Sequence, residues 1–241
     1  MPQESNHLEH PDDAELIPAA TVLLLRDSRA TKTEQAGIEV LMLRRNSKIA
    51  FGGMWVFPGG RVDDHEVVAD DVVASARAAA VREVEEESGL VVQATDLVEW
   101  SYWVPPPMPS MSIKGPRRRF STWFFATPAP EGEVMIDHGE IHDDQWLSPQ
   151  NAMLKHREKE IELAPPTWIT LHQLDRHDTV ADAMAWAAQA NSEEFRTKPI
   201  AKDPTTIAWA GDVAYTGGAF DDPGGRNRLT MHPDGWQYEF S

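Results

Sequence analysis

Residues 82–90 read Arg-Glu-Val-Glu-Glu-Glu-Ser-Gly-Leu, downstream of a stretch at 53–60 that reads Gly-Met-Trp-Val-Phe-Pro-Gly-Gly. If residues 69–88 form one helix, Glu83, Glu86 and Glu87 stand at positions i, i+3 and i+4, so their carboxylates share one face. Like charges at these positions destabilise a helix, and a bound divalent cation would relieve the repulsion. The pattern therefore predicts a divalent-metal site on a helix.

Two neighbouring residues strengthen this interpretation. Arg82 precedes Glu86 by four residues, the separation at which an arginine can hold a carboxylate in a fixed orientation. Gly89 is the residue type favoured just past the end of a helix. An acidic run is more often an ordinary solvated helix face, but such a face would not require the arginine, the glycine and the upstream Pro-Gly-Gly together.

The order of these residues resembles the signature of the Nudix hydrolases, a glycine and a glutamate followed by Arg-Glu-aliphatic-x-Glu-Glu-x-Gly-aliphatic. Residues 82–90 match every fixed position of the second half, and Gly60 and Glu66 match the first half. Fifteen residues, 67–81, separate Glu66 from Arg82 where the family's box has seven, so eight residues are inserted. Because the insertion is rich in alanine and valine, it indicates a lengthened helix more than a loop.

The resemblance implies a hydrolase that cleaves a phosphoanhydride with Mg²⁺ or Mn²⁺. It also implies roles for particular residues. We expect Glu83, Arg82 and Glu86 to carry catalysis, with Glu83 as the base or a further metal ligand. The expected metal ligands are the Gly60 carbonyl oxygen and the carboxylates of Glu83, Glu86, Glu87 and Glu140. Glu140 is included because family members often recruit a glutamate from a loop after the box, ahead of a tryptophan.

Arginines supply candidate contacts to substrate phosphates, since a guanidinium matches phosphate oxygens well. Arg119 lies at the end of the run Arg117 to Arg119, nearest the following expected strand, and Arg44 stands beside Arg45 at the end of another. We expect Arg44 and Arg119 to bind substrate. The alternative for each is an ion pair with one of the many acids of this chain.

A wider resemblance concerns the substrate. Residues 118–125 read Arg-Arg-Phe-Ser-Thr-Trp-Phe-Phe and residues 146–149 read Trp-Leu-Ser-Pro, a pattern similar to the peroxisomal-type coenzyme A diphosphatases and their bacterial relatives. Those enzymes release 3′,5′-ADP and a phosphopantetheine from coenzyme A or acyl-coenzyme A. A second signature of that group is matched at Arg44 and Gly53 but not at Met42 and Ile49.

Two alternatives stay open beside coenzyme A. One is a pyrophosphatase for ADP-ribose or NADH, which would perform the same reaction. The other is a Nudix-fold module that binds a nucleotide without cleaving it. The intact glutamates oppose the binding module, whereas an insertion that displaced Gly60 from Glu86 would favour it.

Composition limits the partners and the compartment. Thirty-nine acidic residues against 22 basic ones give a net charge of −17, which repels long nucleic acid, whereas a small nucleotide can bind through a metal ion. No apolar run approaches the length of a membrane span, and the acidic N-terminal residues do not resemble a secretory signal. With no cysteine in the chain, we expect a cytoplasmic protein. A homodimer is an open alternative.

We expect an α/β fold, a Nudix-type α/β/α sandwich around a mixed β-sheet with a C-terminal helical and hairpin extension. The expected division is a mobile tail at 1–17, the Nudix hydrolase domain at 18–190 and an extension at 191–241. Strands are expected at 19–25, 38–43, 55–57, 97–104 and 120–126, and helices at 69–88, 149–155, from 165 and at 178–190. A hairpin of residues 226–231 and 236–240 closes the chain around Pro-Asp-Gly. The extension could cover the sheet, gate the substrate or pair subunits.

Overall fold

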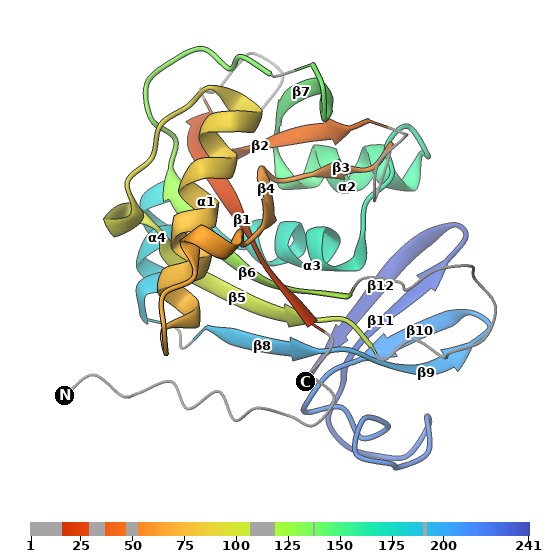
Figure 1. Ribbon diagram of the computed structural model, residues 1–241. Coiled ribbons are helices and arrows are strands. Elements are labelled where there is room, and N and C mark those ends of the chain that lie inside the picture. The colour runs from red at the N-terminus through yellow and green to blue at the C-terminus, as the bar shows by residue number, and fades with distance from the viewer. Residues whose placement is uncertain (1–15, 29–36, 47–52, 107–118, 137, 190–191) are drawn as a thin grey trace.

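The computed structural model describes residues 16–28, 37–46, 53–106, 119–136, 138–189 and 192–241 (Figure 1). The larger sheet has eight strands, which are β1 (Leu16–Ser28), β2 (Gly37–Arg45), β3 (Trp55–Val56), β4 (Gly59–Arg61), β5 (Val98–Val104), β6 (Arg119–Pro128), β7 (Ile141–Leu147) and β8 (Glu193–Arg196). The helices are α1 (Val72–Ser88), α2 (Pro149–Arg157), α3 (Pro165–Leu174) and α4 (Val180–Gln189), with short 3₁₀ turns at Asp64–Glu66 and Ala94–Asp96.

The larger sheet is mixed. Its main strand order is β3-β2-β1-β6-β5-β8, with β4 paired to β1 and β7 paired to β2. The pairs β1–β6 and β5–β8 are parallel, and the other pairs are antiparallel. The predicted mixed sheet is therefore confirmed.

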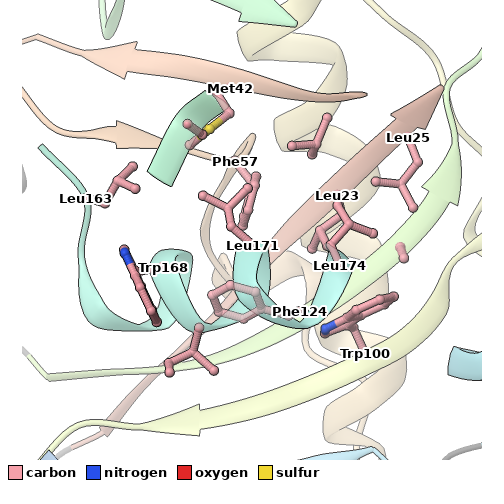
Figure 2. Close-up of a cluster of buried hydrophobic side chains, with 14 of the residues drawn as sticks. Leu23, Leu25, Met42, Phe57, Trp100, Phe124, Leu163, Trp168, Leu171 and Leu174 are labelled. Carbon is pink, nitrogen blue, oxygen red and sulfur yellow. The ribbon is translucent and has the colours of Figure 1, made fainter. Parts of the chain in front are cut away.

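Strand alternation divides the buried side chains into two cores. Leu23, Leu25 and Met42 belong to one core with the apolar faces of α2, α3 and α4. Their neighbours Val22 and Leu24 belong to the other core with α1. Successive side chains of a strand point to opposite faces, so helices cover both faces and give three α/β/α layers. Figure 2 shows the first core, where α3 residues meet strand residues across the layer boundary.

Several elements differ from the sequence expectations. β1 begins at Leu16 and takes up the last residues of the expected tail, whereas residues 1–15 lie outside the described part of the chain. Helix α1 begins at Val72 instead of residue 69, because Asp71 accepts a hydrogen bond from the Ala74 N–H and caps it. Strands β7 and β8 were not anticipated, nor were the strands at Lys198–Lys202 and Thr205–Ala208.

The C-terminal segment contributes to two sheets. β8 joins the edge of the larger sheet beside β5, whereas β9 (Lys198–Lys202), β10 (Thr205–Ala208), β11 (Asn227–His232) and β12 (Gly235–Phe240) form a separate four-stranded sheet. The predicted terminal hairpin is confirmed, since β11 and β12 pair antiparallel from Asn227 opposite Phe240 to His232 opposite Gly235. None of the helices in the described ranges has the length and apolar character required to cross a bilayer.

Candidate active site

Helix α1 carries the acidic cluster at its C-terminal end. Its buried face is made of small residues, Ala76, Ala79 and Ala80 among them, which allow the helix to pack closely on the sheet. Gly89 ends the helix with a φ of 69°, and its N–H bonds to the Glu85 carbonyl oxygen. A left-handed residue at this position favours glycine because it has no Cβ.

Arg82 connects the two halves of the box. Its guanidinium donates to Glu66 Oε1 at 2.7 Å, to Glu83 Oε1 at 2.8 Å and to Glu86 Oε2 at 2.9 Å. It also donates to the Arg61 carbonyl oxygen at 3.0 Å, and the hydrogen bond to Glu66 raises the pKa of Arg82. The eight-residue insertion therefore leaves Glu66 within reach of the helix.

The glycine strand β4 lies directly against the acidic end of α1. The Gly59 N–H donates to Glu87 Oε2 at 2.8 Å. A Cβ on Gly60 would overlap the Glu83 carboxylate, so a larger residue there would displace that carboxylate. The insertion has thus not separated Gly60 from the glutamates, which removes the geometric support for a pure binding module.

Glu87 is the most deeply buried of the three glutamates, with only 3% of its surface exposed. Burial raises its pKa to about 8, despite the Gly59 hydrogen bond and the nearby Arg45 guanidinium. Its Oε1 atom accepts no hydrogen bond from the described residues. Burial also raises the pKa of Glu83, although Arg82 opposes that shift. In contrast, the Glu86 side chain is 59% exposed.

Arg45 joins Glu140 to this cluster. Its Nη2 atom lies 2.9 Å from Glu140 Oε2 and 3.9 Å from Glu87 Oε1. The structure thus brings Glu140 towards the box with Arg45 between the two carboxylates. Sequence reasoning did not choose Arg45 over Arg44, although alternation was a usable signal, because Leu41 and Leu43 pack on the α1 face.

Arg44 lies on the other face of the sheet. It lines a cavity of about 570 Å³ with Trp55, Lys155 and Lys159. Three carboxylates, Asp143, Glu160 and Glu162, also line this cavity. Strand β2 therefore separates the Arg44 side chain from the glutamates. Although Arg44 is next to Arg45 in sequence, its side chain lines a cavity on the opposite face of the sheet.

Arg119 stands at the start of β6 and is buried, with its Nη2 atom donating to the Pro105 carbonyl oxygen at 2.8 Å. Arg117 and Arg118 lie outside the described residues. Among the described residues, the guanidinium groups paired with the glutamates of α1 are those of Arg82 and Arg45.

A protein-family model, described as the NUDIX domain, matches residues 15–167. This covers more than half of the chain. The chain belongs to the Nudix family. Its membership, together with the fold, makes the protein a hydrolase.

Several solved structures are similar to this chain. A NUDIX hydrolase from Alicyclobacillus acidocaldarius matches with a TM-score of 0.59 and 22% identity, over 70% of this chain and 96% of that one. A MutT NUDIX hydrolase from Burkholderia pseudomallei matches with a TM-score of 0.46 and 18% identity, over 66% of this chain and 97% of that one. The NUDIX domain of Shewanella oneidensis NrtR, solved with ADP ribose, matches with a TM-score of 0.46 and 16% identity, over 69% of this chain and 91% of that one. No curated protein matches this Nudix chain.

The acidic residues of this Nudix site are of the right chemical type to bind a divalent metal ion, but their side chains are not arranged around one position. Within the described ranges, no three acidic or histidine side chains form a group that could hold an ion as they stand, because Arg82 and Arg45 lie among the carboxylates. The donors are all oxygens, which Mg²⁺ and Mn²⁺ prefer. Glu87 Oε1 is buried and accepts no hydrogen bond, with the Arg45 guanidinium 3.9 Å away. The residues therefore fit such an ion once the exposed Glu86 side chain turns towards Glu87.

Metal binding is expected to release a proton from Glu87 near pH 7. With a pKa of about 8, this carboxyl is mostly protonated in the metal-free protein at pH 7 and must ionise to bind a cation. Titration calorimetry with Mn²⁺ in buffers of different ionisation enthalpy should show about one proton released per site at pH 7. The affinity for Mn²⁺ should rise with pH until about pH 8, where Glu87 ionises without the metal. An enthalpy independent of the buffer would remove Glu87 from the ligands.

Proposed function

We propose that this Nudix hydrolase cleaves the phosphoanhydride of a nucleoside diphosphate joined to another group, using Mg²⁺ or Mn²⁺. Coenzyme A or acyl-coenzyme A is the favoured substrate. The observation that supports the hydrolytic assignment most directly is the assembly of both halves of the box, in which β4 touches Glu83 and Glu87 while Arg82 binds Glu66, Glu83 and Glu86.

The geometry suggests a distinct task for each acidic residue. Glu86 and Glu87 are the proposed principal metal ligands, with Glu140 and the Gly60 carbonyl oxygen as further ligands. When bound, the ion would gather the negative charge of the diphosphate and make a bound water more acidic.

Glu83 is the proposed base. Only 14% of its side chain is exposed, and its raised pKa makes it a better proton acceptor than a solvated carboxylate. Arg82 donates to both Glu83 and Glu86, so it fixes the direction in which these carboxylates point. We therefore assign Arg82 the task of holding the base and a metal ligand in register.

The coenzyme A assignment is supported by the sequence resemblance and by the placement of Arg44 in the larger cavity. The test is product analysis by chromatography after incubation with Mg²⁺ and a panel of coenzyme A, acetyl-coenzyme A, ADP-ribose, NADH and diadenosine polyphosphates. Release of 3′,5′-ADP from coenzyme A would support the favoured substrate. Release of AMP from ADP-ribose or NADH would replace it, and binding without any cleavage would indicate a nucleotide-binding module.

We expect Arg44→Ala to weaken substrate binding more than turnover. Arg44 lies across the strand from the glutamates and can hold a substrate group without touching the reacting atoms. Steady-state kinetics should show KM raised about tenfold and kcat changed by less than about twofold. An unchanged KM would exclude Arg44 from the substrate site.

A further inference from the structure

A second cavity lies between the end of α2 and the turn of the C-terminal hairpin. Its volume is about 250 Å³. His156, Arg157 and Lys159 line it from the α2 side, and His232 and Trp236 line it from the hairpin. His156 and Lys159 also line the larger cavity that holds Arg44, so the two cavities adjoin.

The charges around this second cavity are unusual for this chain. The protein has a net charge of −17, yet the residues that line the second cavity include a lysine, an arginine and two histidines, with no carboxylate. In the larger cavity, by contrast, Lys155 pairs with Glu160 at 3.0 Å. Basic residues commonly offset the dipole at a helix C-terminus, but Lys159 lies beyond α2 and His232 belongs to β11. Their convergence from separate segments favours an anionic ligand.

The backbone at Lys159 supports a use for its side chain. Its φ is 63°, in the left-handed region where glycine is the favoured residue after a helix. A lysine there stores strain that a glycine would relieve. The position therefore carries a cation beside the cavity at the expense of stability.

His156 is held in a defined hydrogen-bonding state at the boundary between the cavities. Its Nδ1 atom accepts a hydrogen bond from the Leu163 N–H at 3.3 Å. Burial lowers the pKa of His156, although a hydrogen bond to the Ile161 backbone and the charge of Glu162 oppose that shift. The ring also packs edge-on against Trp236, with 4.5 Å between centroids. The hairpin thus fixes the position of the His156 ring at this boundary.

We propose that this second cavity binds a phosphate monoester on the part of the substrate remote from the anhydride. This inference rests on the proposed function, because it specifies which nucleotides the active site takes. A phosphate monoester near neutral pH carries close to two negative charges and pairs well with arginine and lysine. Coenzyme A and NADPH carry such a group on the adenosine ribose, whereas dephospho-coenzyme A and NADH do not.

The test compares matched substrates in wild type and three variants, Lys159→Gly, Arg157→Gln and Lys202→Gln. Wild type should show a KM about tenfold or more lower for coenzyme A than for dephospho-coenzyme A, with NADPH and NADH as a second pair. Lys159→Gly and Arg157→Gln should bring each ratio close to one. Lys159→Gly should also unfold at the same temperature as wild type or higher, because glycine suits its φ. Lys202 is an exposed lysine of β9 outside both cavities, so Lys202→Gln should keep the preference.

The outcomes separate this inference from the proposed function. Equal cleavage of both members of each pair by wild type would overturn the second phosphate site and leave the hydrolase intact. The second phosphate site would also be overturned if Lys159→Gly and Arg157→Gln kept the wild-type preference for coenzyme A over dephospho-coenzyme A. Inorganic phosphate could alter the turnover of dephospho-coenzyme A in wild type but not in Lys159→Gly. If wild type then showed no preference for coenzyme A, the cavity would bind free anions and the substrate-phosphate site would be overturned. No cleavage of any compound would overturn the proposed function, and calorimetric binding of the same pairs would then test the site.

Discussion

Glu87→Gln and Glu86→Gln are each expected to lower kcat about 1,000-fold, equivalent to about 4 kcal/mol of transition-state stabilisation. Each change removes a charge from the proposed metal site while conserving the size of the side chain. The Gly59 N–H can still donate to the side-chain oxygen of glutamine at position 87. The measurement is steady-state hydrolysis of whichever compound of the panel wild type cleaves, at saturating Mg²⁺.

Glu85→Gln is the matched control. Glu85 lies on the same helix, carries the same charge and is exposed, so its replacement should change kcat by less than about twofold. Circular dichroism should show all three variants folded. Near-normal turnover in Glu86→Gln or Glu87→Gln would remove that residue from the metal site.

Asp212→Ala is expected to destabilise the protein by about 3–5 kcal/mol, because it leaves a buried arginine without its counter-charge. Arg228 and Asp212 are both about 1% exposed. They form two hydrogen bonds of 2.7 Å, and Asp212 also accepts from the N–H groups of Asn227 and Ala214. Urea unfolding at pH 7 should show this loss in the free energy of unfolding. Asp221 is an exposed acid of the same loop, so Asp221→Ala should change the free energy of unfolding little.

The same pair sets a dependence on pH. Burial acts to raise the pKa of Asp212, but the bonds from Arg228 and from the backbone outweigh it and lower the pKa below its ordinary value. Its contribution is therefore present above the unfolded-state pKa and is lost as pH falls through the depressed value. The double variant Asp212→Leu with Arg228→Met should be more stable than Asp212→Ala, because it leaves no buried charge without a partner. Equal stability of Asp212→Ala and Asp221→Ala would contradict the assignment.

The sequence predicted those helices and strands whose residue types and hydrophobic spacing match the way they are packed in the fold. The spacing of Arg82 and its glutamates required a helix, and the Pro-Asp-Gly turn between alternating runs required a hairpin, and both are present. Strand β7 escaped prediction because Ile141 is followed by histidine and two aspartates, residue types that weakly favour strands, and only its two end residues are buried.

The candidate site was predictable only in part. Contacts along one helix, such as Arg82 with Glu86, follow from sequence separation. Contacts between distant segments do not, and Arg45 with Glu140 joins residues that are 95 apart in the chain. Which of two adjacent arginines faces the glutamates depends on strand alternation near a bulge between Arg44 and Arg45. The depth at which Glu87 is buried depends on β4, which a helix pattern cannot show.

The pairing of β8 with β5 has a consequence for synthesis of the chain. Residues 193–196 of β8 are made after every other strand of the larger sheet, and they cover the edge of β5. Until they leave the ribosome, the backbone N–H and C=O groups along that side of β5 have no strand to pair with. Nascent chains therefore pass through a stage with an open, aromatic-rich sheet edge, a feature that promotes aggregation. Slow translation between residues 104 and 193 would prolong that stage, and chaperone contact would be most useful then.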